Sequence, residues 1–306
     1  MLQLRAFGDE TRLRMLGSEL ERDGLLHDAI LAPALSGGRA RLEGVVDPDA
    51  ADRALTLARA AGLAENDVSL ARLETIGGSS QPPAVSLIWS DMLGQAAINS
   101  RLLPRYLAFM AVAGVIAGFG VIYNNGILIV GAMAISPDML PIAAICVGAV
   151  SRDAGLAARA AATLLIGFLA TCLSGAALTA ILDPLGVLPA NFEVGASSLS
   201  GLTSINAATI AVALAAGVAA MLALETRASS SVGVAISVTT IPAAAYLGVA
   251  TGVGDADKVL GAAAVLGTNV VLLVAAGTAT LLTQRRLSAR RSSSPRSDEA
   301  ASGSRT

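Results

Sequence analysis

Charged and aromatic side chains are scarce in this sequence of 306 residues, of which 14% are charged and 3% aromatic. A soluble domain carries about 25% charged residues, so this composition argues against an ordinary soluble enzyme. Hydrophobic residues make up 54% of the chain, which excludes an intrinsically disordered protein as well. The sequence has no basic face with interleaved aromatic residues, and nothing therefore favours nucleic-acid binding.

Histidine and cysteine are also nearly lacking. The single histidine is His27, and the two cysteines, Cys146 and Cys172, lie inside apolar runs. In such runs cysteines indicate packing residues rather than a disulfide framework. The apolar runs contain no histidine, which a serine nucleophile would need as its base, and the chain has no glycine-rich phosphate loop. We therefore expect no enzymatic activity, no cofactor, no metal site and no ATP-driven pump.

The charged residues are concentrated towards the two ends of the chain. More than half of them precede residue 102, and few lie between residues 102 and 284. No apolar signal-peptide segment opens the chain, so we expect the first membrane span to act as its own insertion signal. The pattern predicts a soluble domain at residues 1–76 and a linker with an interfacial helix at residues 77–101. A membrane domain should follow at residues 102–284 and a disordered basic tail at residues 285–306.

Six apolar runs are long enough to cross a bilayer, which takes about 17–25 residues. Backbone polar groups find no partners in lipid, so these runs should be helices. They do not alternate apolar with polar residues, which excludes a transmembrane β-barrel. The runs cover residues 106–122, 126–150, 160–182, 205–224, 232–250 and 259–282.

The basic residues predict the orientation of the spans, because arginine and lysine are enriched in cytoplasmic loops. With the N-terminus in the cytoplasm, the arginines that flank the spans all lie inside, and only Lys258 lies outside. The opposite orientation would reverse this distribution. We therefore expect six spans with both termini in the cytoplasm. The arginines concerned are Arg101, Arg105, Arg152, Arg159, Arg227, Arg285, Arg286, Arg290 and Arg291.

An internal repeat relates the two halves of the membrane domain. Residues 134–144 read AISPDMLPIAA and residues 235–245 read AISVTTIPAAA, with six of eleven positions identical. The same offset places the first run on the fourth and the third run on the sixth. Each repeat, 104–182 and 203–283, holds three spans, so the second copy should have the opposite orientation in the membrane. Inverted repeats of this kind are typical of secondary transporters, although they also serve purely architectural purposes.

The middle span of each repeat contains proline. Pro137 and Pro141 lie in the first copy and Pro242 in the second. Proline lacks a backbone donor and clashes with the preceding turn, so we expect each span to kink or split there. Paired broken helices indicate a binding site near the middle of the membrane. Simple kinks in two membrane helices are the alternative explanation.

Asp138 is the only charged residue deep inside an apolar run. An ionised aspartate at that depth costs about 2.5–3.5 kcal/mol on insertion scales, so it should face a cavity or a partner. Two interpretations remain open and are compatible. Asp138 either binds a proton or cation, or it caps the half-helix that follows it.

Further polar residues lie at corresponding or neighbouring positions of the two repeats. Their hydroxyl groups are suited to ion coordination, although serine and threonine in membrane helices often bond to their own helix. Asn269 is also suited to joining two helices by a hydrogen bond. The candidate substrate- or ion-binding residues are Ser136, Pro137, Asp138, Pro141, Ser237, Thr239, Thr240, Pro242, Thr268 and Asn269.

The soluble domain shows the order βαββαβ, which is typical of a ferredoxin-like fold. Residues 1–7 alternate as a strand, and Asp9 is placed to cap a helix that ends near Arg22. Residues 25–35 and 39–46 read as a hairpin, Pro48 opens a second helix that ends near Gly62, and a last strand begins at Val68.

Residues 77–84 are rich in glycine, serine and proline and read as a linker. Residues 85–101 then alternate apolar and polar positions at helical spacing and include the only tryptophan, Trp89, which is typical of an interfacial helix.

Three segments carry a family resemblance: the stretch RLLPRYLAFMAVAGVIAGFGVIYNNGILIVGAMAISPDMLPIAAI, the stretch SVGVAISVTTIPAAA and the LGTN of Leu266–Asn269. They resemble a bacterial family of uncharacterised hydrophobic proteins, the domain of unknown function 389. The resemblance covers most of residues 85–283. It implies a small N-terminal domain, a multi-span core and a location in the bacterial inner membrane. Family members typically carry Ala-Pro-Leu-Met-Gly-Pro at residues 136–141, where this chain has Asp138, and a Pro-Pro pair at residues 241–242, where it has Ile241-Pro242.

Two functions are compatible with this sequence. The first is a secondary transporter or channel for a small solute or ion, with its site between the second and fifth spans. The second is a membrane-anchored sensor or scaffold whose N-terminal domain binds a small ligand or partner. The expected partners are the lipid bilayer, a solute or ion and, in a homo-oligomer, further copies of the chain.

The orientation is directly testable. With six spans and cytoplasmic termini, a tag inserted within residues 185–200 should be accessible from outside the membrane, whereas a C-terminal tag should not. Labelling of intact cells with a membrane-impermeant reagent measures both positions. A tag at residues 185–200 that is reached only after permeabilisation would contradict the topology.

Overall fold

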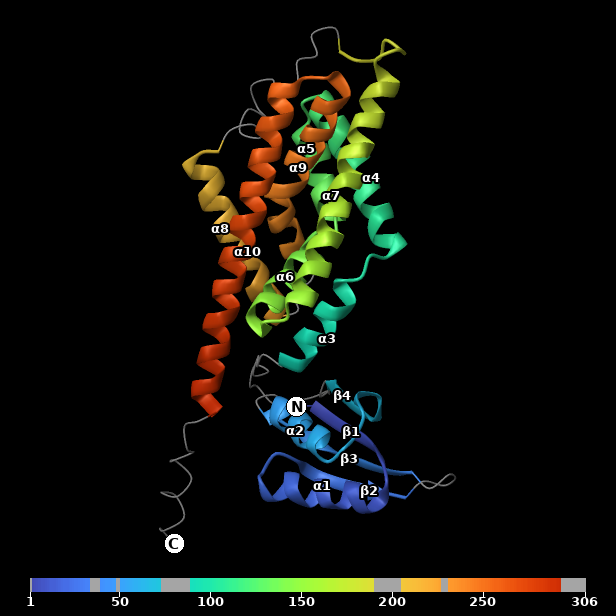
Figure 1. Ribbon diagram of the computed structural model, residues 1–306, viewed down its shortest axis with the longest axis vertical. Coiled ribbons are helices and arrows are strands. Elements are labelled where there is room, and N and C mark those ends of the chain that lie inside the picture. The colour runs from blue at the N-terminus through green and yellow to red at the C-terminus, as the bar shows by residue number, and fades with distance from the viewer. Residues whose placement is uncertain are drawn as a thin grey trace. The chain divides into compact units, whose positions relative to one another are not determined.

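The computed structural model describes residues 2–33, 39–47, 50–72, 89–189, 205–226 and 231–292 (Figure 1). Contacts divide the chain into two compact units, of which the first comprises Met1–Asp91 and Arg285–Thr306 and the second Met92–Gln284. We call Met1–Asp91 the N-terminal unit and Met92–Gln284 the helical unit.

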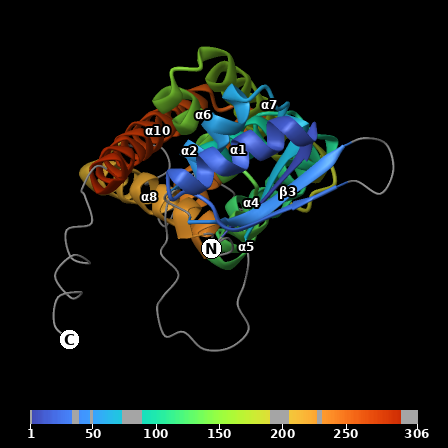
Figure 2. The same ribbon diagram turned by 90° about the horizontal axis from the view of Figure 1, so that it is seen from below.

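The N-terminal unit has the predicted element order βαββαβ. Its four strands form one antiparallel sheet in the order β2-β3-β1-β4. Figure 2 shows α1 and α2 together with strand β3 of the sheet. The elements are β1 Leu2–Gly8, α1 Glu10–Arg22, β2 His27–Ala32, β3 Ala40–Val46, α2 Ala51–Ala60 and β4 Val68–Arg72, with a short 3₁₀ helix at Glu65–Asp67.

Alternation along the strands gives the sheet one packed face. Leu2, Leu4 and Ala6 of β1 are buried in a core that they share with leucines and alanines of α1 and α2. Arg5 and Phe7 alternate with them and are exposed. The two helices therefore cover one face of the sheet, as the period of two residues predicts.

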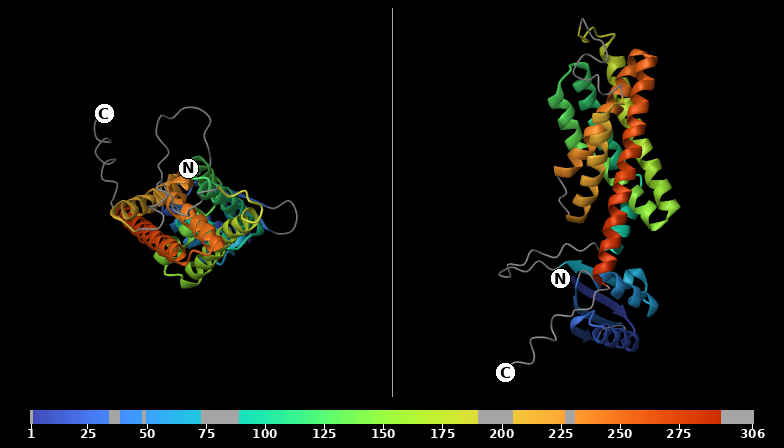
Figure 3. Two further views of the ribbon diagram at one scale, coloured as in Figure 1. Left: turned by 90° about the horizontal axis from the view of Figure 1, so that it is seen from above. Right: turned by 90° about the vertical axis from the view of Figure 1, so that its left-hand side faces the viewer.

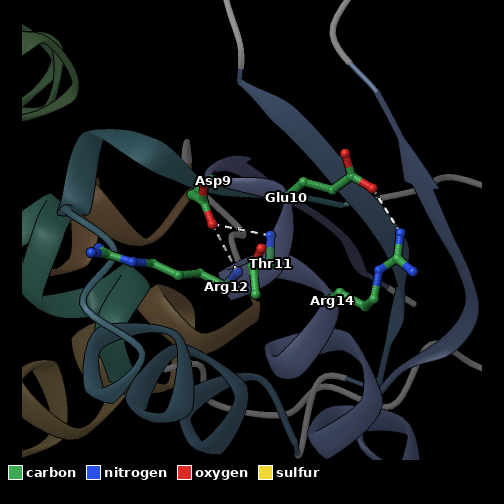
Figure 4. Close-up of polar contacts among 5 residues, drawn as sticks. All are labelled: Asp9, Glu10, Thr11, Arg12 and Arg14. Atoms are coloured by element: carbon green, nitrogen blue, oxygen red, sulfur yellow. Dashed lines mark hydrogen bonds and ion pairs between the residues drawn. The ribbon is translucent and has the colours of Figure 1, made fainter.

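Asp9 caps α1 as the sequence predicts (Figure 4). Its Oδ1 accepts hydrogen bonds from the backbone N–H groups of Thr11, at 3.0 Å, and Arg12, at 3.3 Å. These two bonds satisfy donors that a helix start otherwise leaves unpaired. The next residue, Glu10, pairs with Arg14 one turn further along α1 at 2.7 Å.

The described part of the second helix begins at Ala51, after one 3₁₀ residue at Ala50. It ends at Ala60, and Gly62 follows with φ of 78°, in agreement with the predicted end. Pro48, the predicted hairpin tip at residues 36–38 and the linker at residues 77–84 lie outside the described residues.

The helical unit consists of helices that run side by side, as the side and end views show (Figures 1 and 3). Among the described residues, four helices, α4, α7, α8 and α10, are long and apolar enough to cross a membrane, and the bent pair α5–α6 makes a fifth candidate. The apolar helices are consistent with a membrane protein. The bounds are α3 Trp89–Asn99, α4 Pro104–Ile122, α5 Gly126–Ile135, α6 Met139–Ser151, α7 Ala154–Leu182, α8 Ala207–Thr226, α9 Ser231–Val253 and α10 Ala256–Ser292.

The predicted break in the second run is confirmed, and the predicted break in the fifth is wrong. α5 and α6 are separated at residues 136–138 and differ in direction by 54°. In contrast, α9 continues through Pro242 as one helix. A membrane helix can continue through proline where its surroundings adjust to the lost backbone bond. Three residues before Pro242, the carbonyl of Thr239 accepts from Asn269 Nδ2 at 2.7 Å.

The predicted disordered tail also needs correction at its start. α10 extends to Ser292, so residues 285–292 are helical. Four arginines at the end of this helix lie close to its negative pole, where cations are favoured. The rest of the predicted tail, residues 293–306, lies outside the described residues.

Glycines allow α4 and α9 to approach α7 closely. A Cβ atom on Gly114 would lie 2.7 Å from the carbonyl oxygen of Thr171, and one on Gly248 would lie 2.3 Å from that of Cys172. A Cβ on Gly252, one turn after Gly248, would lie 2.9 Å from the carbonyl oxygen of Ala176, also on α7. Small residues at this four-residue spacing therefore bring the backbones of α7 and α9 together.

We predict that Gly248→Ala destabilises the helical unit, because the new methyl group meets backbone rather than a movable side chain. Overpacking of this kind costs about 1–3 kcal/mol. Gly267→Ala is the matched control, since a Cβ there meets nothing within 4 Å. Thermal unfolding in detergent, followed by helix content, measures both variants. Equal melting temperatures for the two variants would show that the α7–α9 contact is not tight.

Candidate functional site

Asp138 lies at the break between α5 and α6 and is completely buried. The break follows from the prolines. Pro137 cannot continue α5, because it has no N–H group to donate back along the helix, and Pro141 fits the first turn of α6, where no such donor is needed. The chain thereby places a carboxyl group inside the helical unit, one residue before a new helix begins.

Hydroxyl groups from two separate elements hold the Asp138 side chain. Ser136 donates to Oδ1 at 3.0 Å from within the break. Thr240 of α9 donates to Oδ2. The two oxygens of the carboxyl group thus each accept a hydrogen bond, and one of these bonds joins the two repeats of the sequence.

The Asp138 side chain makes no capping bond to α6, although the residue occupies the N-cap position. Its oxygens face Ser136 and Thr240 instead of the first amides of the helix. This arrangement argues against the interpretation that Asp138 is a helix cap. It agrees with the interpretation that the carboxyl group has a role of its own.

Asn269 connects α10 to the same region. It is 2% exposed, and its Nδ2 donates to the Thr239 carbonyl, next to Thr240. Its Oδ1 is buried and has no hydrogen-bond partner among the residues that the structure describes. We call Ser136, Asp138, Thr239, Thr240 and Asn269 the Asp138 cluster.

The remaining predicted site residues contribute less. Pro137 and Pro141 shape the break, and Pro242 lies inside α9 close to Thr240. Thr268 is only half-buried on α10, and none of the bonds that build the Asp138 cluster involves it. Ser237 belongs to α9, but its side chain lies outside the described residues.

Tyr106 is a neighbour of this cluster that the sequence analysis missed. It lies in the first turn of α4, is 8% exposed and stands one turn before Met110, which contacts Ser136. Its hydroxyl group is buried without a hydrogen-bond partner in the described part of the chain. The ring lies against Gly167 of α7, where a Cβ would be 2.3 Å from the hydroxyl oxygen. A tyrosine within an apolar run of a chain with few aromatics was the available signal.

Met110, one turn after Tyr106 on α4, completes the surroundings. Ser136 Oγ lies 3.5 Å from its sulfur atom, and the Met110 carbonyl accepts from Thr171 of α7 at 3.1 Å. Among the described residues, no group of three histidine, cysteine, aspartate or glutamate side chains is placed to hold a metal ion. The chemistry of the cluster is that of one carboxyl group surrounded by neutral hydroxyl and amide groups.

Residues 133–275 match the model of a family described as a domain of unknown function, DUF389. The chain carries a DUF389 domain. This confirms the family to which the sequence motifs point. The DUF389 match includes the break, α9 and Asn269, so the whole Asp138 cluster lies inside it. The chain has no match among curated proteins and none among solved structures.

We predict that Asn269→Ala destabilises the DUF389 domain, because the hydrogen bond between α10 and the Thr239 carbonyl of α9 is lost. A hydrogen bond of this kind contributes about 0.5–1.5 kcal/mol. Thr268→Ala, at the adjacent half-buried position, is the control and should change stability little. Denaturant titration of both variants in detergent compares them. If Thr268→Ala costs as much as Asn269→Ala, the bond to α9 is not the cause.

Proposed function

We propose that this DUF389 protein is a secondary transporter or channel for a small solute or ion, with its site at the Asp138 cluster. One observation carries the proposal: a completely buried carboxyl group in a broken helix is bonded to a hydroxyl group on α9. Ionisable residues inside membrane segments are costly and usually mark substrate or ion pathways. Broken helices, with their exposed backbone groups, are the usual place for such sites.

The proposal includes six spans arranged as two inverted repeats. The sequence offset of 101 places α4 at 205–223, near α8, and α7 at 255–283, near α10. It likewise places the pair α5–α6 at 227–252, near α9. Under this scheme α9 is the fifth span and the counterpart of the broken pair, and both termini lie in the cytoplasm.

Matched contacts support the repeat. Within the first copy, Gly114 of α4 packs against the Thr171 carbonyl of α7, with 2.7 Å to an added Cβ. Within the second copy, Gly217 of α8 packs against the Leu273 carbonyl of α10, with 2.6 Å. The first and third helices of each copy therefore meet through the same kind of contact.

A second matched pair joins the two copies to each other. The Cys172 thiol of α7 donates to the Ala244 carbonyl of α9 at 3.1 Å. Reciprocally, the Cys146 thiol of α6 lies 3.7 Å from the Val274 carbonyl of α10. In each case the third helix of one copy contacts the middle element of the other, as a two-fold relation between the copies requires.

The N-terminal unit supports a second candidate function, that of a membrane-anchored sensor or scaffold. We propose that it is ferredoxin-like, on the strength of its strand order β2-β3-β1-β4. The open face of its sheet carries charged residues around Glu43, which pairs with Arg5 at 2.9 Å and with Arg41 at 3.4 Å, and exposed Phe7 lies on the same strand as Arg5. Such a face offers both charge and apolar surface to a small ligand or partner.

We predict that Asp138→Asn abolishes coupled flux while leaving the fold intact. Asparagine keeps the shape of the side chain but neither titrates nor carries charge. Flux of ions and small metabolites is measured in proteoliposomes at matched protein content and over a range of pH. Asp183→Asn, at the exposed end of α7, is the matched control and should transport as the wild type does.

Wild-type flux from Asp138→Asn at every pH would remove Asp138 from the proposed site. Absence of flux from the wild-type protein for every solute tested would favour the sensor function instead.

A further inference from the structure

We propose that Ser136 fits the Asp138 cluster to a proton rather than to a metal cation. Its hydroxyl hydrogen points to Asp138 when the carboxyl group is ionised, and it turns to the sulfur atom of Met110 when the carboxyl group is protonated. This names the ion of the proposed function and rests on that function for the step of transport. Proton binding itself is measurable without any flux.

Asp138 is the only charged side chain among the buried residues that the structure describes. The described charged side chains of α4, α7 and α10 lie near the ends of these helices and are exposed or half-buried, and α5, α6 and α9 carry none. A proton that binds at the break therefore removes the charge of the helical interior. The other titratable groups on the helices around the break are uncharged phenols and thiols, namely Tyr106 of α4, Cys146 of α6, Cys172 of α7 and Tyr246 of α9.

A metal cation would find the backbone carbonyl groups of the break already engaged. Hard cations such as Mg²⁺ and Ca²⁺ take about six oxygen ligands or more. The Pro137 carbonyl accepts from the backbone N–H of Leu140 at 3.1 Å, and the Asp138 carbonyl accepts from that of Ile142 at 3.4 Å. The Thr239 carbonyl accepts from α10 at 2.7 Å. A cation would have to displace these donors, whereas a proton only adds to one carboxylate oxygen.

Two hydroxyl donors satisfy the ionised carboxyl group. A carboxylate only accepts hydrogen bonds. Ser136 donates to Asp138 Oδ1 at 3.0 Å, and Thr240 donates to Oδ2. Hydrogen bonds to a charged acceptor are the stronger ones, so the Ser136 hydrogen points to the carboxylate in this state.

Met110 allows Ser136 to adapt to the protonated state. Ser136 Oγ lies 3.5 Å from the Met110 sulfur atom, which is a weak hydrogen-bond acceptor. A serine hydroxyl group accepts as well as donates. When Asp138 Oδ1 carries a proton, it donates to Ser136 Oγ, and the Ser136 hydrogen turns to the sulfur atom. Thr240 continues to donate to Oδ2, so each of these hydrogens has an acceptor in either state.

The binding step is balanced with water as the only other reactant. One O–H bond of a hydronium ion breaks, and one O–H bond forms on Asp138 Oδ1; release is the reverse. The Ser136 hydroxyl group keeps its own hydrogen throughout and only rotates. No atom is oxidised or reduced.

Infrared difference spectroscopy of the full chain in liposomes tests proton binding. The wild-type spectrum minus that of Asp138→Asn isolates this carboxyl group from the other acids of the chain. The difference should contain a protonated-carboxyl band that disappears as the pH is raised and that moves to lower frequency in heavy water. Asp183→Asn should retain the band. Sodium or magnesium ions added at constant pH should leave it unchanged.

Two substitutions test the part played by Ser136. Ser136→Ala should shift the frequency of the band, because protonated Asp138 loses its acceptor. Ser174→Ala, which removes a hydroxyl group bonded within α7, should not shift it. Met110→Leu nearly keeps the side-chain volume but removes the sulfur acceptor, so the band should be weaker at a given pH. Met221→Leu, at a completely buried position of α8, is the control and should leave its amplitude unchanged.

Three results would overturn the inference. They are a band that sodium or magnesium ions remove at constant pH, equal band frequencies for Ser136→Ala and Ser174→Ala, and equal band amplitudes for Met110→Leu and Met221→Leu. Titration of Asp138 in a protein that shows no flux would leave proton binding in place and remove the proposed function. Flux that depends on Asp138 without any titrating band would do the reverse.

Discussion

The interior of the helical unit depends on one constraint: each polar group placed there must find its partner within the protein, because lipid offers none. The Asp138–Thr240 hydrogen bond is the most demanding case, since it satisfies a carboxyl group with no exposed surface. The bond from Asn269 to the Thr239 carbonyl obeys the same rule and joins α10 to α9. These bonds hold α9, α10 and the α5–α6 break in a fixed relation.

Much of the architecture was predictable because it follows from local patterns. The place of Asp9 before a helical pattern predicted that it caps α1. Pro137 and Pro141 predicted the break between α5 and α6. The position of Asp138 opposite the second repeat followed from the internal symmetry of the sequence. Such features can be recognised from neighbouring residues or from the offset between the two repeats of the sequence.

The errors arose where a distant partner decides the outcome. Pro242 predicts a break from the local sequence alone, yet α9 continues through it as one helix in its packed surroundings. Tyr106 was missed because its neighbours in sequence do not show where it packs; its ring lies against Gly167 of α7, which is distant in sequence.

The length of α5 has an electrical consequence. Its ten residues make a helix of about 15 Å at 1.5 Å per residue. That is about half of a hydrocarbon layer of about 30 Å, which places the end of α5, and Asp138 just beyond it, near mid-depth in a spanning arrangement. A charge that travels from one surface to that depth crosses about half of the membrane voltage, worth about 1 kcal/mol at 100 mV. Occupancy of Asp138 by a proton would then respond to voltage as well as to acidity.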